Sequence, residues 1–143
     1  MHQFSAARFT YERFAKDTLY ADQRLEAQFK RAVSALEAED EDAEGLFQSF
    51  VRTHREHPRS SEAAFYLGNF RFDKRDYAGA LRAFSAVRAA DVWPEQRDET
   101  TFKQGYAHMQ LKQDRQALHY FNYLKERQAT IGLMLITMRA IWS

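Results

Sequence analysis

The stretch "AAFYLGNFRFDKRDYAGALRAF", residues 63–84, decides the fold expected for this chain. It consists of two runs of aromatic and small residues separated by the charged turn "DKRD". Apolar residues recur every three or four positions in both runs, which is the spacing of one face of an α-helix. Gly68 and Ala80 lie among bulky residues, although glycine inside a helix costs about 1 kcal/mol relative to alanine. The pattern therefore predicts two antiparallel helices that approach closely where these two small residues lie.

The same arrangement recurs along the chain. Alanine is followed four positions later by an aromatic residue and seven positions later by an apolar one, and successive alanines are 36, 37 and 37 residues apart. The four occurrences are Ala7/Tyr11/Phe14, Ala43/Phe47/Phe50, Ala80/Phe84/Val87 and Ala117/Phe121/Leu124. Offsets of four and seven share one helical face, so each occurrence predicts a helix that packs against a neighbour. In the last two occurrences a glycine, Gly68 or Gly105, precedes the alanine by twelve residues.

The composition predicts one all-helical domain. The 143 residues are 45% hydrophobic, with two prolines and five glycines, and the period-two alternation typical of strands is absent. We expect about seven or eight helices, near residues 3–16, 20–38, 41–55, 61–73, 77–89, 97–111, 114–127 and 131–141. Ser60 or Ser61 is the expected N-cap of the helix that follows Pro58. Trp93, in the longest connection, is expected to pack beneath the helices rather than to bind a partner.

Several kinds of chemistry find no support in the sequence. The formal net charge of +1, from 21 basic and 20 acidic residues, gives no field that would attract nucleic acid. The absence of cysteine excludes disulfides, thiolate catalysis and thiolate zinc sites. The acidic run at residues 37–44 lacks the glycine and the spaced glutamate of a calcium loop, and His54 and His57 lack a metalloprotease motif. We therefore expect no enzyme activity, no cofactor and no metal site.

Residues 60–127 resemble the tetratricopeptide repeat, and residues 1–59 resemble it mainly in their second helices. The matching positions are Leu67-Gly68, Tyr77, Ala80-Leu81, Phe84 and Val87, and then Phe102, Gly105, Tyr106, Ala107, Ala117-Leu118 and Phe121. The resemblance implies a right-handed superhelical stack of antiparallel helix hairpins, known as an α-solenoid. It divides a single domain, residues 1–143, into a half repeat at 1–18, a divergent repeat at 19–58, repeats at 60–94 and 97–128, and a capping or partial helix at 130–143.

A narrower resemblance concerns location. The long period and the junction "FVRTHREHPRSSEAAFYLGNF", residues 50–70, are similar to large repeat proteins of the bacterial cell envelope, of a type common in Bacteroidetes. This implies a periplasmic or envelope location, although residues 1–14 show no signal-peptide pattern.

The resemblance also implies a binding site. In this family the first helix of each hairpin lines a concave groove that takes a peptide or a partner helix. The groove residues expected here are Phe65, Asn69, Phe72, Asp73, Phe102, Tyr106, Met109 and Gln110, flanked by Glu62 and Glu99. For Phe65 and Phe102 the alternative is packing between hairpins. Because Phe65 stands where one subfamily has a lysine that clamps a carboxylate, a hydrophobic peptide or a neighbouring repeat is the expected ligand.

The last residues suggest a second function. The sequence "IGLMLITMRAIWS", residues 131–143, is almost continuously apolar and begins where a further first helix would begin. It is too short to span a bilayer, so we expect it to cap the last hairpin or to associate with a second copy. The main hypothesis is a protein–protein interaction scaffold. The alternative is a structural segment of a longer solenoid that binds neighbouring repeats or self-associates through its apolar ends.

Overall fold

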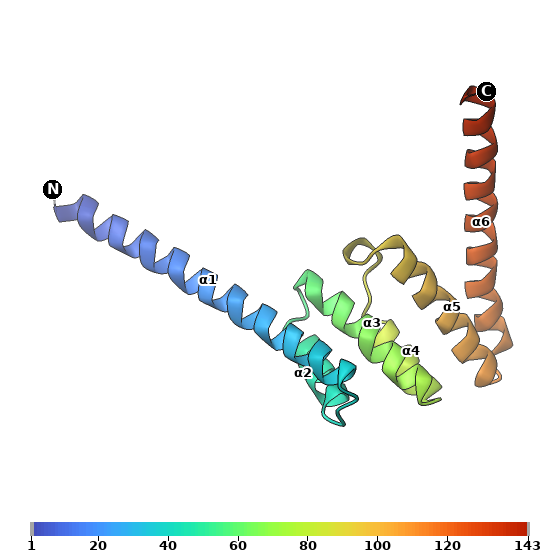
Figure 1. Cartoon of the computed structure of the whole chain (residues 1–143), viewed down its shortest axis with the longest axis horizontal. Coiled ribbons are helices and arrows are strands. Elements are labelled where there is room, and N and C mark those ends of the chain that lie inside the picture. The colour runs from blue at the N-terminus through green and yellow to red at the C-terminus, as the bar shows by residue number, and fades with distance from the viewer. Residues whose placement is uncertain (1, 143) are drawn as a thin grey trace. The chain divides into compact units, whose positions relative to one another are not determined.

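The computed structural model describes the backbone of residues 2–142 and the side chains of residue 13 and residues 16–141. Within that part of the chain all regular structure is helical and no strand is present. The elements are α1 (His2–Glu37), α2 (Ala43–Thr53), α3 (Pro58–Asp73), α4 (Tyr77–Phe84), the 3-10 helix η1 (Ala89–Asp91), α5 (Pro94–Gln110) and α6 (Asp114–Trp142) (Figure 1). The all-α class is confirmed, but the described residues contain six α-helices rather than seven or eight.

Two expected helix boundaries are wrong. Residues 17–19 continue α1, and residues 128–130 continue α6. Neither place contains proline or glycine, so no residue there removes a backbone hydrogen bond or strongly disfavours helix. The expected boundaries came from the period of the repeat, and a period alone does not end a helix.

The chain divides into two compact units, residues 1–50 and 51–143. In the first unit, α1 and α2 contribute the buried residues Leu25, Phe29, Ala32, Ala43, Phe47 and Phe50. The rings of Phe29 and Phe50 meet edge to face, with centroids 5.6 Å apart. Burial of the face Ala43/Phe47/Phe50 is therefore confirmed, whereas the side chains of Ala7/Tyr11/Phe14 lie outside the described residues. The single domain expected over the whole chain stays a prediction.

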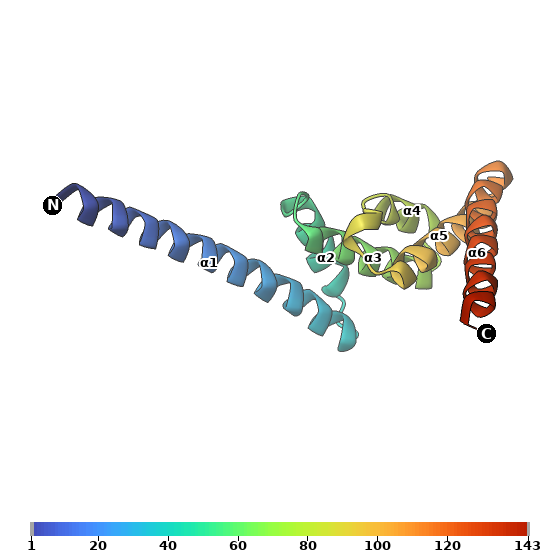
Figure 2. The ribbon, with the colours of Figure 1, turned by 90° about the horizontal axis from the view of Figure 1, so that it is seen from above.

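In the second unit, α3 packs along α4 and α5 packs along α6, and α5 also contacts α3 and α4 (Figures 1 and 2). Phe65 and Phe84 belong to the buried core of the first of these helix pairs. A Cβ placed on Gly68 would overlap the ring of Phe84, and one placed on Gly105 would lie 2.8 Å from Cε1 of Phe121. The prediction that these glycines lie where two helices meet is confirmed.

Three local expectations are corrected by the second unit. His57 is the N-cap of α3, because its Nδ1 accepts a hydrogen bond from the Arg59 N–H at 3.1 Å, while Ser60 and Ser61 are buried. Trp93 is 73% exposed rather than packed beneath the helices. Helix α4 ends at Phe84, several residues earlier than expected.

Candidate functional site

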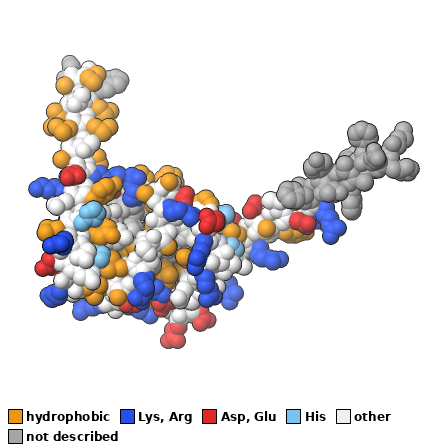
Figure 3. Space-filling model, turned by 180° about the vertical axis from the view of Figure 1, so that it is seen from behind, with side chains coloured by type: hydrophobic (Ala, Val, Ile, Leu, Met, Phe, Trp, Pro, Cys, Tyr) orange, Lys and Arg blue, Asp and Glu red, His pale blue; other side chains and the backbone are white. Residues whose placement is uncertain are grey.

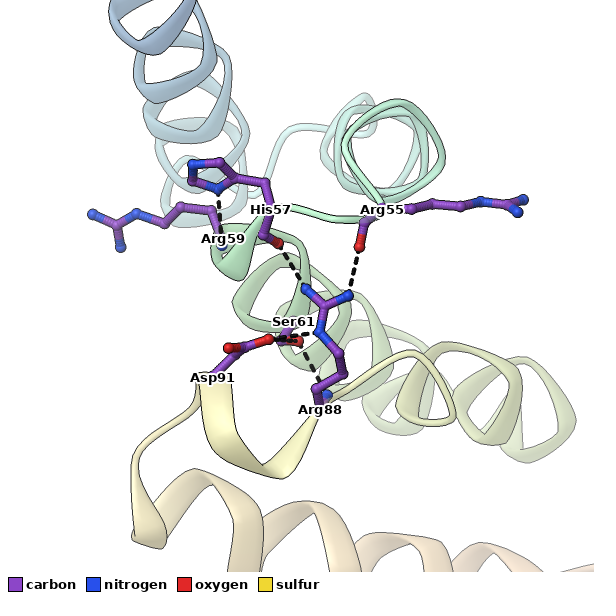
Figure 4. Close-up of polar contacts among 6 residues, drawn as sticks. All are labelled: Arg55, His57, Arg59, Ser61, Arg88 and Asp91. Atoms are coloured by element: carbon purple, nitrogen blue, oxygen red, sulfur yellow. Dashed lines mark hydrogen bonds and ion pairs between the residues drawn. The ribbon is translucent and has the colours of Figure 1, made fainter.

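The loop after α4 is held against the beginning of α3 by Arg88 (Figure 4). Its guanidinium donates to the carbonyl of Arg55 at 2.7 Å, to the carbonyl of His57 at 3.0 Å and to Oδ2 of Asp91 at 2.6 Å. The Arg88 N–H donates to Oγ of the fully buried Ser61 at 3.0 Å. The Arg88 N–H bonds Ser61 instead of a carbonyl of α4, and the guanidinium ties this loop to the segment before α3; the chain turns here and returns as α5.

No corresponding loop follows the second helix pair, where α6 continues, and the three side chains that close the first loop differ there. Thirty-seven positions after Ser61, Arg88 and Asp91 the sequence has Asp98, Lys125 and Gln128. Asp98 instead faces Arg127 of α6, with Oδ1 and Nε 3.0 Å apart but not aligned as a hydrogen bond. This ion pair joins α6 to α5 and favours continuation of α6 past Phe121, which is the equivalent of Phe84 at the end of α4.

Lys103 connects the two helix pairs, and the sequence had not singled it out. Its Nζ donates to Oδ1 of Asn69 on α3 at 2.9 Å and to Oε1 of Glu99 at 2.8 Å. It also lies 5.2 Å from the centre of the Phe72 ring. The lysine side chain is mostly buried, so its charge is balanced by Glu99 and by the ring face rather than by water. A Glu–Lys spacing of four on α5, opposite an aromatic residue on α3, was the available signal.

Five aromatic rings form a continuous cluster from α3 to α6. Phe72 lies 5.6 Å from Tyr77 and 5.4 Å from Tyr106, measured between ring centroids. Phe102 follows, 6.5 Å from Tyr106 and 6.0 Å from Phe121. Such distances are typical of stabilising ring contacts. The cluster therefore gives rigidity to the surface on which the groove was expected.

The eight expected groove residues do not form one open surface. Phe65 is only 5% exposed and belongs to the core, which agrees with the packing alternative rather than with a place in an open groove. Asn69, Phe72 and Tyr106 are half-buried, because they make the contacts between the helix pairs. The four residues that stay exposed are Asp73, Phe102, Met109 and Gln110. The exposed part of the expected groove therefore lies mainly on α5, with Asp73 at the end of α3.

Equivalent positions in the two helix pairs differ in exposure. Phe65 is 5% exposed, whereas Phe102, thirty-seven residues later, is 51% exposed. Phe84 is 1% exposed, whereas its equivalent Phe121 is half-buried. The first pair is followed by α5, but among the described residues no helix covers the second pair in the same way. We call Phe102, Met109 and Phe121, the equivalents of Phe65, Phe72 and Phe84, the end surface.

The C-terminal half of α6 is also uncovered. Its exposed apolar residues are Ile131, Leu133, Met134, Leu135, Ile136, Met138 and Ile141. They point to all sides of the helix, and Figure 3 shows hydrophobic side chains along this part of α6. A helix that is apolar all round is normally buried. We call residues 131–141 the apolar segment; its large side chains are exposed, and the expected cap or association with a second copy stays a prediction.

The polar groups considered for chemistry serve local structure. His57 caps α3, and His108 Nδ1 lies 2.6 Å from Oε1 of Gln113 while its ring stacks on Tyr120. In the acidic run, Oδ1 of Asp40 accepts a hydrogen bond from the Asp42 N–H, as in a turn. Among the side chains that the structure describes, no group of three or more histidine, aspartate or glutamate residues is arranged to hold a metal ion.

Comparison of the chain with protein-family models, with curated proteins and with solved structures gives no match. No helix within residues 2–142 combines the length and the apolar character that crossing a bilayer requires.

Proposed function

We propose that this chain is a protein-binding module built from helix pairs of the tetratricopeptide type, stacked as a right-handed solenoid. Three observations support the proposed architecture: the 37-residue recurrence, the contact of Gly68 with Phe84 and of Gly105 with Phe121, and the packing of α5 on both α3 and α4. In such an architecture each pair offers the next one an apolar face. The module needs no cofactor and performs no reaction.

The observation that carries the binding function is the exposure of Phe102. A phenylalanine at the equivalent place, Phe65, is buried, so the fold has a defined way of covering this position. Phe102 is supported by contacts with Tyr106 and Phe121, and Met109 is 40% exposed on the same helix. A rigid, half-exposed aromatic residue beside a flexible methionine is typical of protein-binding surfaces. The end surface, with the exposed Gln110 next to Met109 on α5, is the proposed binding surface.

Site-specific photocrosslinking in the producing cell tests this proposal. Replacing Phe102 with benzoylphenylalanine keeps an aromatic ring in place and should capture a protein chain on irradiation. Trp93 is the matched control, because it is an exposed aromatic residue of the same unit outside the end surface. Capture at position 102 and not at position 93 supports the proposal. No protein captured at 102, or equal capture at both positions, contradicts it.

A second candidate function is structural, as a segment that binds neighbouring helical repeats. The observation that favours it is the position of the apolar segment. Ile131 follows Pro94, the first residue of α5, by thirty-seven residues, so the segment begins where the next first helix of the series would begin. The two candidates share the end surface and differ only in what covers it.

A further inference from the structure

We propose that the end surface is covered by a second copy of this chain, with the apolar segments of the two copies exchanged. Residues 131–141 of each copy would pack on Phe102, Met109 and Phe121 of the other. This inference rests on the proposed function and names its partner. It concerns only residues 51–143, which form one compact unit.

The contacts between the α3–α4 pair and the α5–α6 pair indicate how the apolar segment would align with α5 of the other copy. Lys103 contacts Asn69 and Tyr106 contacts Phe72, so helix α5 meets helix α3 at a constant offset of 34 residues. Applied to the second pair, the same offset places Ile136 opposite Phe102 and Ala140 opposite Tyr106. An aliphatic side chain then meets the exposed ring, and a small residue meets the half-buried one. The apolar segment thus fits the end surface in both position and residue type.

The chain's own segment is held away from this surface. To reach it, α6 would have to end near Phe121, as α4 ends at Phe84, and the residues that follow would have to form a loop. The bonds that close the first loop are missing, because Asp98, Lys125 and Gln128 replace Ser61, Arg88 and Asp91. Helix α6 instead runs without a break to Trp142. A segment that does not fold back on its own chain is free to occupy the same place in another copy.

The area that the exchange would remove from water approaches that of a stable dimer. Burying an aliphatic side chain of this size removes on the order of 100 Å² from water, and because the seven side chains point to all sides of the helix, packing on one surface covers about half of them, or roughly 350 Å² per copy. Each copy also buries its end surface, and a standard interface buries about 800 Å² per partner. The segment carries one charged residue, Arg139, so little charge must be desolvated when it packs. Reciprocal exchange uses the same two patches on both copies and closes as a dimer.

Light scattering after size exclusion measures the first consequence. The purified full chain should be a dimer, and Ile136→Asp should weaken the dimer at least about tenfold, because a carboxylate would be buried against Phe102. Ile136 is 67% exposed, so this change leaves the fold of one copy intact, which circular dichroism verifies. Trp93→Asp is the control, because it makes the same kind of change outside the end surface and should leave the dimer unchanged. A monomeric wild-type chain, or a dimer insensitive to Ile136→Asp, overturns the inference.

Disulfide trapping measures the second consequence, and the absence of natural cysteine makes it clean. The double variant Phe102→Cys/Ile136→Cys should oxidise to a covalent dimer, because disulfides form only between residues already close together. A disulfide within one copy would mean that the segment folds back on its own chain, and a ladder of larger species would mean open assembly. Either result, or no disulfide at all, overturns the exchange. If the chain is monomeric while position 102 still captures another protein, the dimer is wrong and the proposed function stands; if neither occurs, both are wrong.

Discussion

Replacing Gly68 with alanine is the sharpest test of how α3 and α4 pack. In an open helix interior this change stabilises by about 1 kcal/mol, because glycine loses more backbone entropy on folding. Here the new Cβ would overlap Cδ1 and Cε1 of Phe84 and would lie 2.8 Å from its Cζ. Phe84 is 1% exposed and belongs to one core cluster with Phe65 and Ala80, so its ring can move only by displacing these neighbours or by shifting toward the cavity that it lines with Thr100 and Tyr120. Overpacking of this kind costs about 1–3 kcal/mol and occasionally more.

Because the overlap is with a buried ring, the cost lies in the upper part of that range, about 2–3 kcal/mol, and helix propensity offsets about 1 kcal/mol, so Gly68→Ala should destabilise the second unit by about 1–2 kcal/mol. For a domain of this size that corresponds to a fall in the thermal midpoint of about 5–10 °C. Two matched glycines provide the scale. Gly105→Ala places its Cβ 2.8 Å from Phe121, but this ring is half-buried and can yield, so the net change should be near zero. Gly45→Ala meets nothing within 4 Å and should stabilise the first unit by about 0.5–1 kcal/mol.

Urea unfolding at one fixed protein concentration gives the comparison, with tryptophan fluorescence following the second unit and hydrogen exchange following α2. The slope of free energy against urea should be unchanged, so the midpoints alone report stability. A Gly68→Ala variant as stable as the natural chain would refute the predicted overlap with Phe84. A cost no larger than that of Gly105→Ala would show that burial of the opposing ring does not control the penalty.

Three further changes test the contacts that position the end surface. Arg88→Ala should lower the free energy of unfolding in urea by about 1–2 kcal/mol, because the carbonyls of Arg55 and His57 lose a charged donor. Arg88→Lys should recover less than half of this loss. An unchanged urea midpoint for Arg88→Ala would show that the loop does not depend on the guanidinium. Lys103→Met keeps the aliphatic part of the side chain and removes the ammonium, so it should lower the free energy of unfolding by about 1 kcal/mol and speed amide hydrogen exchange in α5. Equal exchange rates in the variant and the natural chain would contradict the role of the Asn69 contact. The triple variant Asp98→Ser/Lys125→Arg/Gln128→Asp gives the second helix pair the side chains that close the loop after α4. Circular dichroism should then report a lower helix content, and light scattering should report a monomer. An unchanged helix content would show that these three residues do not decide where α6 ends.

The packing of the helix pairs was predictable from the sequence because it depends on side-chain volume at fixed spacing. When a glycine precedes an alanine by twelve residues and an aromatic residue follows that alanine by four, the aromatic ring lies against the glycine, which has no side chain. This is found at Gly68 with Phe84 and at Gly105 with Phe121. The all-helical class follows from the same periodicity.

Other features were not predictable, because they depend on atoms that all residues share or on neighbours that a motif does not specify. Arg88 binds backbone carbonyls, and a carbonyl acceptor leaves no pattern in the sequence. The burial of Phe65 and the exposure of Phe102 concern the same residue type at equivalent positions, so only the presence of α5 beyond the first pair distinguishes them. The missing boundary within α6 has the same origin, because the repeat period continues while the side chains that would end the helix do not.

The contrast between the two pairs explains why an apolar end and an unbroken helix occur together. If α6 ended as α4 does, residues 131–141 would be free to cover Phe102 in the same chain, and both apolar surfaces would be removed from water at once. Because α6 continues, the end surface and the apolar segment are both exposed on one unit and do not contact each other. Two complementary apolar surfaces that do not meet within a copy lower the free energy by meeting between copies, as the proposed exchange requires. The side chains at positions 98, 125 and 128 would then decide whether this fold closes on itself or binds another chain.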